Sequence, residues 1–555
     1  MGEGSVTTPA RLKPPSWKLK PPHDKWAQGL VVSGFANLEY GQALFLCCDW
    51  PENGPSGPYV KGKAAWLKTL YSMAPITDAD ERDDRAAALA LTWTGLQKSG
   101  LSQDALATFA APFREGMYQE DRLRRLGDKV GDEWQKTVID SGPRWSGNTP
   151  GRGDIEEPKQ VWERTLRDVG RPAESKERQS RTPITVHALL VLYDKTEAAV
   201  EQWADDISKR LKAEKIETVH RLPLNLRLVN RIGREHFGFA DGLSQPIPYD
   251  AAHEKPDPSD VVVMSDGSSA KNDKRHGVPL GEILLGHING HHEAARGPMV
   301  ADQPGDTKAR DSKLPTEGAP DGFYNLGLDG SYLVVRELRQ DVAAFWNSMK
   351  ENARRIQAHD PTAAHVTAEW LAERVIGRNR DGHLLCPKGL LKPDQYEMPQ
   401  NAFGFRHPDP DGVGCPPGSH VRRANPRDSL AKDLASAETL LSAANNHRIL
   451  RRGRKYGTTI ENPEKDDGQQ RGLLFMCLNT DIARQFEFVQ QTWLLNRNFH
   501  TLYDETDPLV GPKGQFTIRE EPLRRIVEVE TFIKMAGGEY FFLPSIPALN
   551  YLASL

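Results

Sequence analysis

Apolar residues occur along the chain in short runs and in helical stripes, separated by long polar tracts. The run Ala43–Cys47 predicts a first strand, and Ile184–Asp194 predicts another. Residues Thr77–Gly100 predict a helix, because Ala86, Leu89, Ala90 and Trp93 recur at helical spacing and Thr77 can cap it. A further helix is predicted over Thr196–Leu211, with an apolar stripe at Val200, Trp203, Ala204, Ile207 and Leu211.

The second half of the chain repeats this order of strand and helix. Strands are predicted at Gly330–Leu338 and Gly472–Asn479, and helices at Gln340–Ile356, Ser429–Asn446 and Asp481–Leu495. The tracts 140–183, 249–274, 296–321 and 386–418 are polar and rich in turn residues, which indicates loops. The pattern predicts an α+β protein of two lobes, 1–245 and 246–555, in which helices cover one face of a sheet.

Composition and charge argue against several classes of protein, among them nucleic-acid-binding, membrane-spanning and disulfide-rich proteins. The chain has 555 residues, enough for two or more domains, and 72 Lys and Arg against 76 Asp and Glu leave a net charge of −4. That balance gives no electrostatic argument for nucleic acid or an anionic membrane. The N-terminal residues contain no apolar core of an export signal, and no run is long enough to span a membrane. Five cysteines without a CxxC pair disfavour a disulfide framework. A cytoplasmic protein is therefore expected.

The segment HFGFADGLSQP, residues 236–246, contains a single acid, Asp241, in an apolar and turn-forming context. Asp-Gly is common turn chemistry, so a structural turn accounts for it. The alternative is a working acid or base, because glycines on either side allow a ligand to approach the backbone closely. The segment alone leaves both interpretations open.

A second segment, GSHVRRANPRD, places His420 just before Arg422, Arg423 and Arg427. Imidazole is the commonest metal-ligand side chain, and guanidinium groups pair with carboxylates and phosphates. The combination suits a ligand that has both a metal and acidic arms, such as haem with its iron and two propionates. The alternative is a solvated basic turn.

Three further segments contain candidate catalytic or binding residues. In HRILRRGRKYG, Arg451 could stabilise charge on a small bound oxidant, or it belongs to a basic loop. In GLLFMCLN, Leu473 and Phe475 share one face of a strand and could line a dry pocket or pack in the core. GHINGHH has no HExxH arrangement, which favours loop histidines over a metal site at His287 and His291.

In their order along the chain, these motifs resemble those of the dye-decolourising peroxidases. The matching segments are GFADG, GEILLG, GSYLVVREL, GSHVRRANPRD, ILRRGRKYG and GLLFMCLNTDIARQFEFVQQTW. The resemblance implies two ferredoxin-like α+β domains that form a dimeric α+β barrel. It also implies one haem b per chain, between the sheet and the helices of the C-terminal half. The length and the loop insertions are similar to the larger-chain subgroup of that family.

The resemblance also assigns residues to the haem site. His420 corresponds to the axial haem ligand, and Asp241 and Arg451 correspond to the distal acid and the distal arginine. Residues expected to contact the haem are Leu473 and Phe475 in the distal pocket and Arg422 or Arg427 at the propionates. A carboxylate is expected to hydrogen-bond the second nitrogen of His420, and Asp507 is the candidate.

These residues imply a peroxidase that takes hydrogen peroxide and oxidises bulky aromatic donors such as anthraquinone or azo dyes and phenolics. Asp241 would move a proton between the peroxide oxygens, and Arg451 would stabilise the charge that develops as the O–O bond breaks. A haem-handling protein with little turnover is the alternative, although storage needs neither residue. Neither nucleic acid nor a membrane is an expected partner, and a homo-oligomer is left open.

Overall fold

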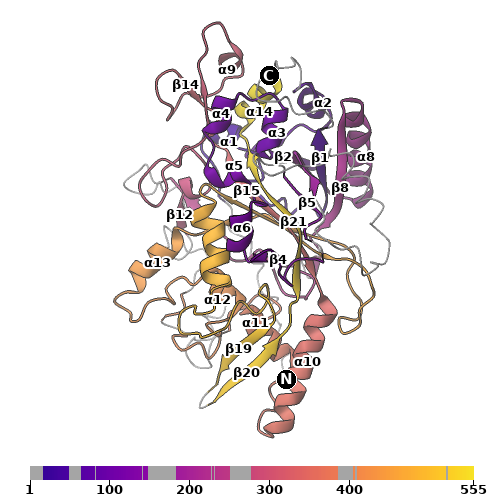
Figure 1. Ribbon diagram of the computed structural model, residues 1–555, viewed down its shortest axis with the longest axis vertical. Helices are drawn as coiled ribbons and strands as arrows, with labels where there is room; N and C mark the ends of the chain where they lie inside the picture. The colour runs from indigo at the N-terminus through magenta and orange to yellow at the C-terminus, as the bar shows by residue number, and fades with distance from the viewer. Residues whose placement is uncertain are drawn as a thin grey trace, which may run out of the picture.

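The structure is a computed structural model, which describes residues 17–48, 64–81, 83–140, 142–147, 183–226, 228–229, 232–250, 277–385, 404–406, 409–520 and 523–555. Its centre is a ring of antiparallel strands with helices packed around the outside (Figure 1). Four strands come from the N-terminal half and the others from the C-terminal half.

The N-terminal half contains one βαββαβ unit. Its elements are β1 (Tyr40–Cys48), α2 (Ala65–Met73), β2 (Arg85–Leu91), β7 (Ala188–Asp194), α8 (Glu197–Ala213) and β8 (Ile216–Asn225). The strands lie side by side in the order β8-β1-β7-β2, and each neighbouring pair is antiparallel. This succession of elements is the ferredoxin-like motif.

The C-terminal half repeats the arrangement. Its elements are β15 (Ser331–Gln340), α10 (Val342–His359), a broken strand formed by β16 (Leu450–Arg451) and β17 (Arg454–Tyr456), β18 (Gly472–Asn479), the helical segments η4 (Ala483–Glu487) and η5 (Val489–Leu494), and β21 (Ile533–Leu543). The strands lie in the order β17-β18-β15-β21, again antiparallel. The expected α+β fold with two ferredoxin-like units is therefore confirmed. The proposed division at residue 245 falls between β8 and β15 and stays a prediction.

The two units join edge to edge and close the ring. At one junction β17 pairs with β8, and at the other β2 pairs with β21. Alternate residues of every strand point inward, where they form one apolar cluster that includes Phe45, Val191, Val335, Met476 and Phe541. Because successive side chains of a strand face opposite sides, the residues between these positions point outward. The barrel interior is therefore packed with side chains from both halves.

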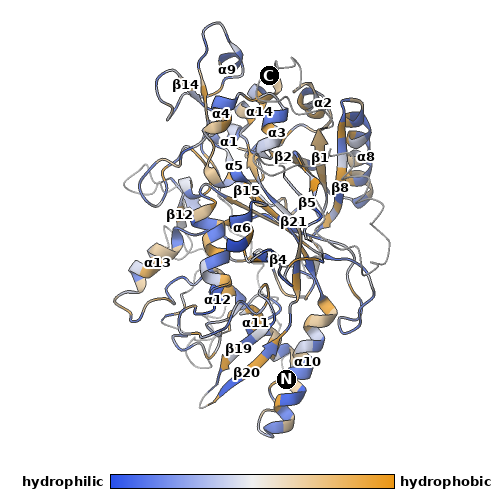
Figure 2. Ribbon diagram, in the orientation of Figure 1, coloured by the Kyte–Doolittle hydropathy of each residue, from blue (hydrophilic) through white to orange (hydrophobic). Residues whose placement is uncertain are grey.

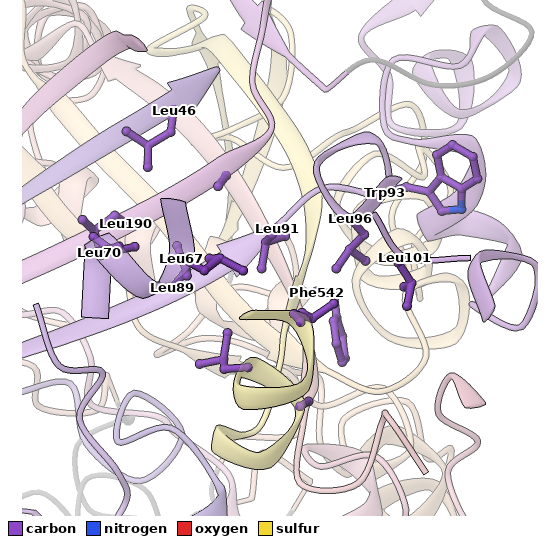
Figure 3. Packing of buried hydrophobic residues seen from close by; sticks show 14 of the residues in the cluster. Leu46, Leu67, Leu70, Leu89, Leu91, Trp93, Leu96, Leu101, Leu190 and Phe542 are labelled. Carbon is purple, nitrogen blue, oxygen red and sulfur yellow. The ribbon is translucent and has the colours of Figure 1, made fainter. Parts of the chain in front are cut away.

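Helices cover the outward face of the N-terminal unit. Leu67 and Leu70 of α2 point toward Leu89 and Leu190 of the sheet (Figure 3). The C-terminal helix α14 (Ile546–Ser554) packs into the same apolar cluster. Figure 2 shows the strands of the ring mainly in the hydrophobic colour, whereas α8 and α10 carry many hydrophilic residues on their outer sides.

The prediction of a single helix over Thr77–Gly100 is wrong. The structure has β2 at Arg85–Leu91, followed by the short helix α3 at Trp93–Lys98. Within β2, Ala88 faces the barrel interior while Leu89 faces the helices, and both are buried. Because both faces are covered, the strand shows no alternation of apolar and polar residues, and its alanines imitate a helical stripe. The Thr77 hydroxyl accepts a hydrogen bond from the backbone N–H of Ala87 instead of capping a helix.

Two other predicted helices differ in detail. Of the helix predicted over Ser429–Asn446, only α13 (Ala437–Asn445) is helical. The helix predicted over Asp481–Leu495 is present as η4 and η5, but it is wound as a π-helix with bonds such as Leu495 N–H to the Gln490 carbonyl. Such windings are rare and occur frequently at functional sites. The strands at β1, β15 and β18 and the helices α8 and α10 lie where they were predicted.

Among the described helices, none is long and apolar enough to cross a membrane. Four of the five cysteines lie in the described part of the chain; all four are buried and none of them forms a disulfide there. Much of the predicted loops 140–183, 249–274 and 386–418 lies outside the described residues.

Glu337, a buried acid inside the barrel, makes a contribution to the free energy of unfolding that depends on pH. Glu337 of β15 accepts hydrogen bonds from Trp145 Nε1 at 2.7 Å and from His220 Nε2 at 2.9 Å. Burial raises the pKa of Glu337, but the charge and hydrogen bond of His220, together with Trp145 and Arg144, hold the pKa below its usual value of about 4.3. Its stabilising contribution is therefore present above about pH 4.3 and is lost as the pH falls through the lower, folded-state pKa.

Glu337→Gln should therefore destabilise the protein near pH 6 and make less difference as the pH is lowered toward 3. Urea unfolding followed by circular dichroism at several pH values measures the difference between the two proteins. Glu201→Gln, at an exposed position on α8, is the matched control. A destabilisation by Glu337→Gln that stays constant across this range would contradict the assignment.

Candidate functional site

A cavity of about 270 Å³ lies against the outward face of the C-terminal unit, between the sheet and the helical segments. One wall consists of outward residues of β15, β18 and β21, among them Leu338, Leu473, Phe475 and Met535. In the strand register Leu338 lies opposite Leu473, so these side chains are neighbours on one face. The opposite wall comes from α12 (His420–Ala424) and from η4 and η5, through residues such as Phe486, Val489 and Leu494. The cavity thus lies between the sheet and the helices of the C-terminal half, and its assignment as the expected haem site stays a prediction.

His420 is the first residue of α12 and lines this cavity. Its Nδ1 lies 3.0 Å from Oδ2 of Asp507. A carboxylate accepts hydrogen bonds, so Nδ1 carries the proton and Nε2 is the nitrogen that can bind a ligand. The expected carboxylate partner of His420 is therefore found, and it is Asp507.

Asp507 is held in place from three directions. Its side chain is fully buried, and its Oδ1 accepts the backbone N–H groups of Leu509 and Val510, each at 2.9 Å. Burial raises the pKa of Asp507, but His420, the charge of Arg423 and these N–H groups outweigh burial and leave the pKa below its usual range. Asp507 is therefore ionised at neutral pH and fixes the orientation of the His420 ring.

The short helix α12 is anchored by its neighbours. The hydroxyl of Ser419, which precedes it, donates to the Arg374 carbonyl at 2.5 Å. Arg423 is buried and donates to the carbonyl oxygens of Trp493, Asn496 and Glu505. These bonds tie α12 to η5 and to the loop that contains Asp507. Arg423 therefore has a structural role that its motif alone did not reveal.

Asp241 and Arg451 lie together on the rim of the same cavity. Oδ1 of Asp241 is 3.3 Å from Nη1 of Arg451, and the two side chains are 37% and 32% exposed. Arg451 ends β16, and its backbone N–H donates to Oε1 of Gln245 while its carbonyl accepts from Nε2. The GFADG segment and the RRG segment, 210 residues apart, are thus bonded to each other.

A partly buried acid that the sequence did not single out, Glu235, shapes the GFADG turn. Glu235 accepts the backbone N–H groups of Phe237 and Phe239, at 2.7 and 2.8 Å, and Nε2 of Gln340 at 2.7 Å. Burial is the main cause that raises the pKa of Glu235, and the charge of Asp241 adds to it. Because Glu235 fixes the residues just before Asp241, it positions that carboxylate at the cavity.

The two arginines expected at the propionates are not among the residues that line the cavity. Arg422 is buried and its Nη1 donates to the carbonyl oxygens of Asp409 and Cys415. Arg427 is also buried and contacts the hydroxyl of Ser244. Instead, Arg378 and Arg448 line the cavity, and burial lowers the pKa of each to about 10. Their positions could not be read from the sequence, because which arginine faces the cavity depends on how segments far apart along the chain pack together.

Comparison with known proteins supports the resemblance in sequence and in fold. No family model matches the chain. It is 28% identical over 387 residues to the multifunctional dye peroxidase DyP2 of Amycolatopsis sp., covering 66% of this chain and 71% of that one. It is 26% identical over 401 residues to the dye-decolorizing peroxidase msp1 of Mycetinis scorodonius, covering 67% and 66%. A deferrochelatase of Yersinia pestis is 27% identical over 226 residues, which span 40% of this chain and 35% of that one.

Solved structures of DyP-type peroxidases show the same similarity at the level of the fold. The crystal structure of a DyP-type peroxidase from Anabaena sp. superposes with a TM-score of 0.61 and 24% identity, covering 96% of this chain and 94% of that one. The chain thus has the fold of the DyP-type peroxidases. The expected resemblance to the dye-decolourising peroxidases is confirmed by sequence relatives as well as by the fold.

Removing the Asp507 carboxylate should cost stability even without any ligand. Asp507→Ala leaves His420 Nδ1–H and two backbone N–H groups without their acceptor, so we expect a loss of about 2–4 kcal/mol in the free energy of unfolding. Chemical denaturation measures it. Asp84→Ala is the control, because Asp84 pairs with Lys195 but its side chain is 86% exposed, and it should cost well under about 1 kcal/mol. Equal losses in the two variants would contradict the anchoring role of Asp507.

Proposed function

We propose that this protein is a haem-dependent peroxidase that reduces hydrogen peroxide and oxidises bulky aromatic donors such as anthraquinone or azo dyes and phenolics. One observation carries the proposal. A single cavity is lined by an imidazole backed by a buried carboxylate, His420 and Asp507, and by an acid and arginine in contact, Asp241 and Arg451. An axial ligand and a proton-transfer pair at one cavity are what peroxide reduction on haem requires.

The residues present fit a haem b. Nε2 of His420 is the ring nitrogen free to bind iron, because Nδ1 is bonded to Asp507. Leu473 and Phe475 belong to a largely apolar wall, which suits a porphyrin face. The buried guanidinium groups of Arg378 and Arg448, which line the cavity, supply positive charge for propionates, whereas Arg422 and Arg427 do not line it.

When bound, haem supplies the redox chemistry by which peroxide takes up two electrons. The chain supplies the proton transfers. Asp241 takes a proton from one peroxide oxygen and returns it to the other, which then leaves as water. The Arg451 guanidinium, 3.3 Å from Asp241, offsets the negative charge that builds up while the O–O bond breaks. Two one-electron donors complete the balance, so that one peroxide and two protons yield two water molecules.

The Asp507 carboxylate acts through His420. A hydrogen bond from Nδ1–H to an ionised carboxylate makes the imidazole a stronger donor and fixes its ring plane. Asp507 is therefore a positioning residue, and it would raise the basicity of the His420 nitrogen that would hold the iron.

The haem assignment is tested by His420→Ala. We expect the wild-type chain, expressed with haem supply, to be red-brown with a Soret band, and the variant to lose the band or to show it shifted. His291→Ala, at an exposed loop position, is the control and should leave the spectrum unchanged. An unaltered Soret band in His420→Ala would remove His420 as the axial ligand.

Asp241→Asn keeps the shape of the side chain but removes its ability to take a proton. We expect the reaction with hydrogen peroxide, followed by stopped-flow absorbance, to slow by about 10²–10⁴-fold. Arg451→Ala should slow it by about 10²–10³-fold, because the developing charge loses its donor. Asp84→Asn, at an exposed site far along the chain, is the control. A wild-type rate in Asp241→Asn would exclude this residue from the reaction.

A steady-state assay with peroxide and an anthraquinone dye separates this proposal from haem handling without turnover. The deferrochelatase match gives that alternative some support, but it spans only 35% of that relative. Sustained dye oxidation that falls in Asp241→Asn supports the peroxidase. Haem binding with no dye oxidation would favour the alternative.

A further inference from the structure

A second group of metal-ligand side chains lies outside the cavity described above. It consists of His23, His287 and Asp329, whose ligand atoms all lie within 4.8 Å of one another. None of them lines the cavity of His420. They come from three distant segments: α1 (His23–Trp26), the GHINGHH loop, and the turn that leads into β15.

We propose that these side chains form a binding site for a divalent transition-metal ion of the zinc class. Two imidazoles and one carboxylate are the protein ligands of zinc sites that keep an open position, and of the 2-His-1-carboxylate sites of iron(II). A water molecule would complete a tetrahedral set. The ion would join the N-terminal segment to the start of the C-terminal unit.

The geometry of the group supports this proposal. Nδ1 of His23 lies 2.8 Å from Oδ2 of Asp329, and Nε2 of His287 lies 2.6 Å from Oδ1. The two rings are 4.9 Å apart and inclined by 74°, so both nitrogens converge on one carboxylate. With zinc–ligand bonds of about 2.0–2.2 Å, neighbouring ligand atoms in a tetrahedron are roughly 3.3 Å apart. The two N–O distances are about 0.5–0.7 Å shorter than this spacing, so each imidazole nitrogen would have to move away from the carboxylate by about that much to admit the ion.

Burial and a backbone hydrogen bond hold Asp329 in one position within the proposed site. Its side chain is fully buried, whereas those of His23 and His287 are 22% and 14% exposed, so an ion can enter from the histidine side. Its backbone adopts a φ of +59°, which is strained for a residue with a side chain. A bond from its N–H to the Leu285 carbonyl holds this conformation. Strain of this kind occurs where a side chain must be aimed at a functional site.

The surrounding charge also favours a cation. The carboxylates of Glu317 and Asp250 act on His23 through their negative charge, in addition to Asp329. These carboxylates place negative charge around the histidines, which attracts a divalent ion. His291, in the same loop as His287, is exposed and belongs to no such group among the described residues.

The test is Zn²⁺ binding by the purified full-length chain after EDTA treatment and gel filtration. In competition with a chromophoric chelator, we expect one Zn²⁺ per chain with a Kd of about 1 µM or below, weaker than structural sites with four ligands. Loss of an outer hydrogen-bond partner weakens metal sites about 10–100-fold, so loss of a ligand in His287→Ala should weaken binding by at least about 100-fold. His291→Ala is the matched control and should bind as the wild type does.

Two further measurements on the wild-type chain test metal binding even if a variant folds poorly. Co²⁺ added to the wild-type chain should give intense visible absorption bands, which indicate four-coordinate geometry and need no variant. Zn²⁺ should also raise the melting temperature of the wild type but not that of His287→Ala. No zinc binding, or equal binding by wild type and His287→Ala, would overturn the proposal. Neither result bears on the peroxidase reaction, which is read from the haem spectrum and from dye oxidation.

Discussion

The pairing of β15 with both β18 and β21 is the constraint on which the rest of the structure depends. It completes the second ferredoxin-like sheet, which β17 and β21 join to the first, so the ring closes. Inward residues such as Val335 fill the barrel. A ligand of this fold must therefore lie outside the barrel, on the outward side chains of the same strands. That is where the cavity is found.

The geometry of the cavity depends equally on carboxylates that are removed from water and are stabilised by hydrogen bonds or positive charges. A buried carboxylate is costly unless hydrogen bonds or positive charges balance it. Asp507 meets this condition through His420 and two backbone N–H groups, and Glu235 meets it through the turn that carries Asp241. Each acid thus fixes a residue that faces the cavity. Asp329 follows the same principle at the separate histidine cluster, where its two oxygens hold two imidazoles.

The sequence predicted the strands and helices best where the apolar residues form a stripe at helical spacing or a short continuous run. The stripe of α8 and the run at β18 were placed correctly, because burial and spacing agree there. It failed at Arg85–Leu91, where burial on both faces removes the alternation that marks a strand. It also could not predict that the segment after β18 winds as a π-helix, because that winding changes hydrogen-bond partners without changing which residues are apolar.

By itself, the sequence determined the α+β class, the repeated order of strand and helix, and the identities of the polar residues in the GFADG, GSHVRRANPRD and RRG segments. It left each of them open between a turn or basic loop and a working site, because local spacing carries no information about residues far along the chain. Only the tertiary structure brought Asp241 to Arg451 and His420 to Asp507, and only it placed Arg378 and Arg448 at the cavity in preference to Arg422 and Arg427. It also joined His287 to His23, 264 residues earlier, although the spacing within GHINGHH had favoured loop histidines over a metal site. The physical reason is that closing the ring brings together strand ends and turns from both halves, and the buried charges there can be balanced only by partners from distant segments.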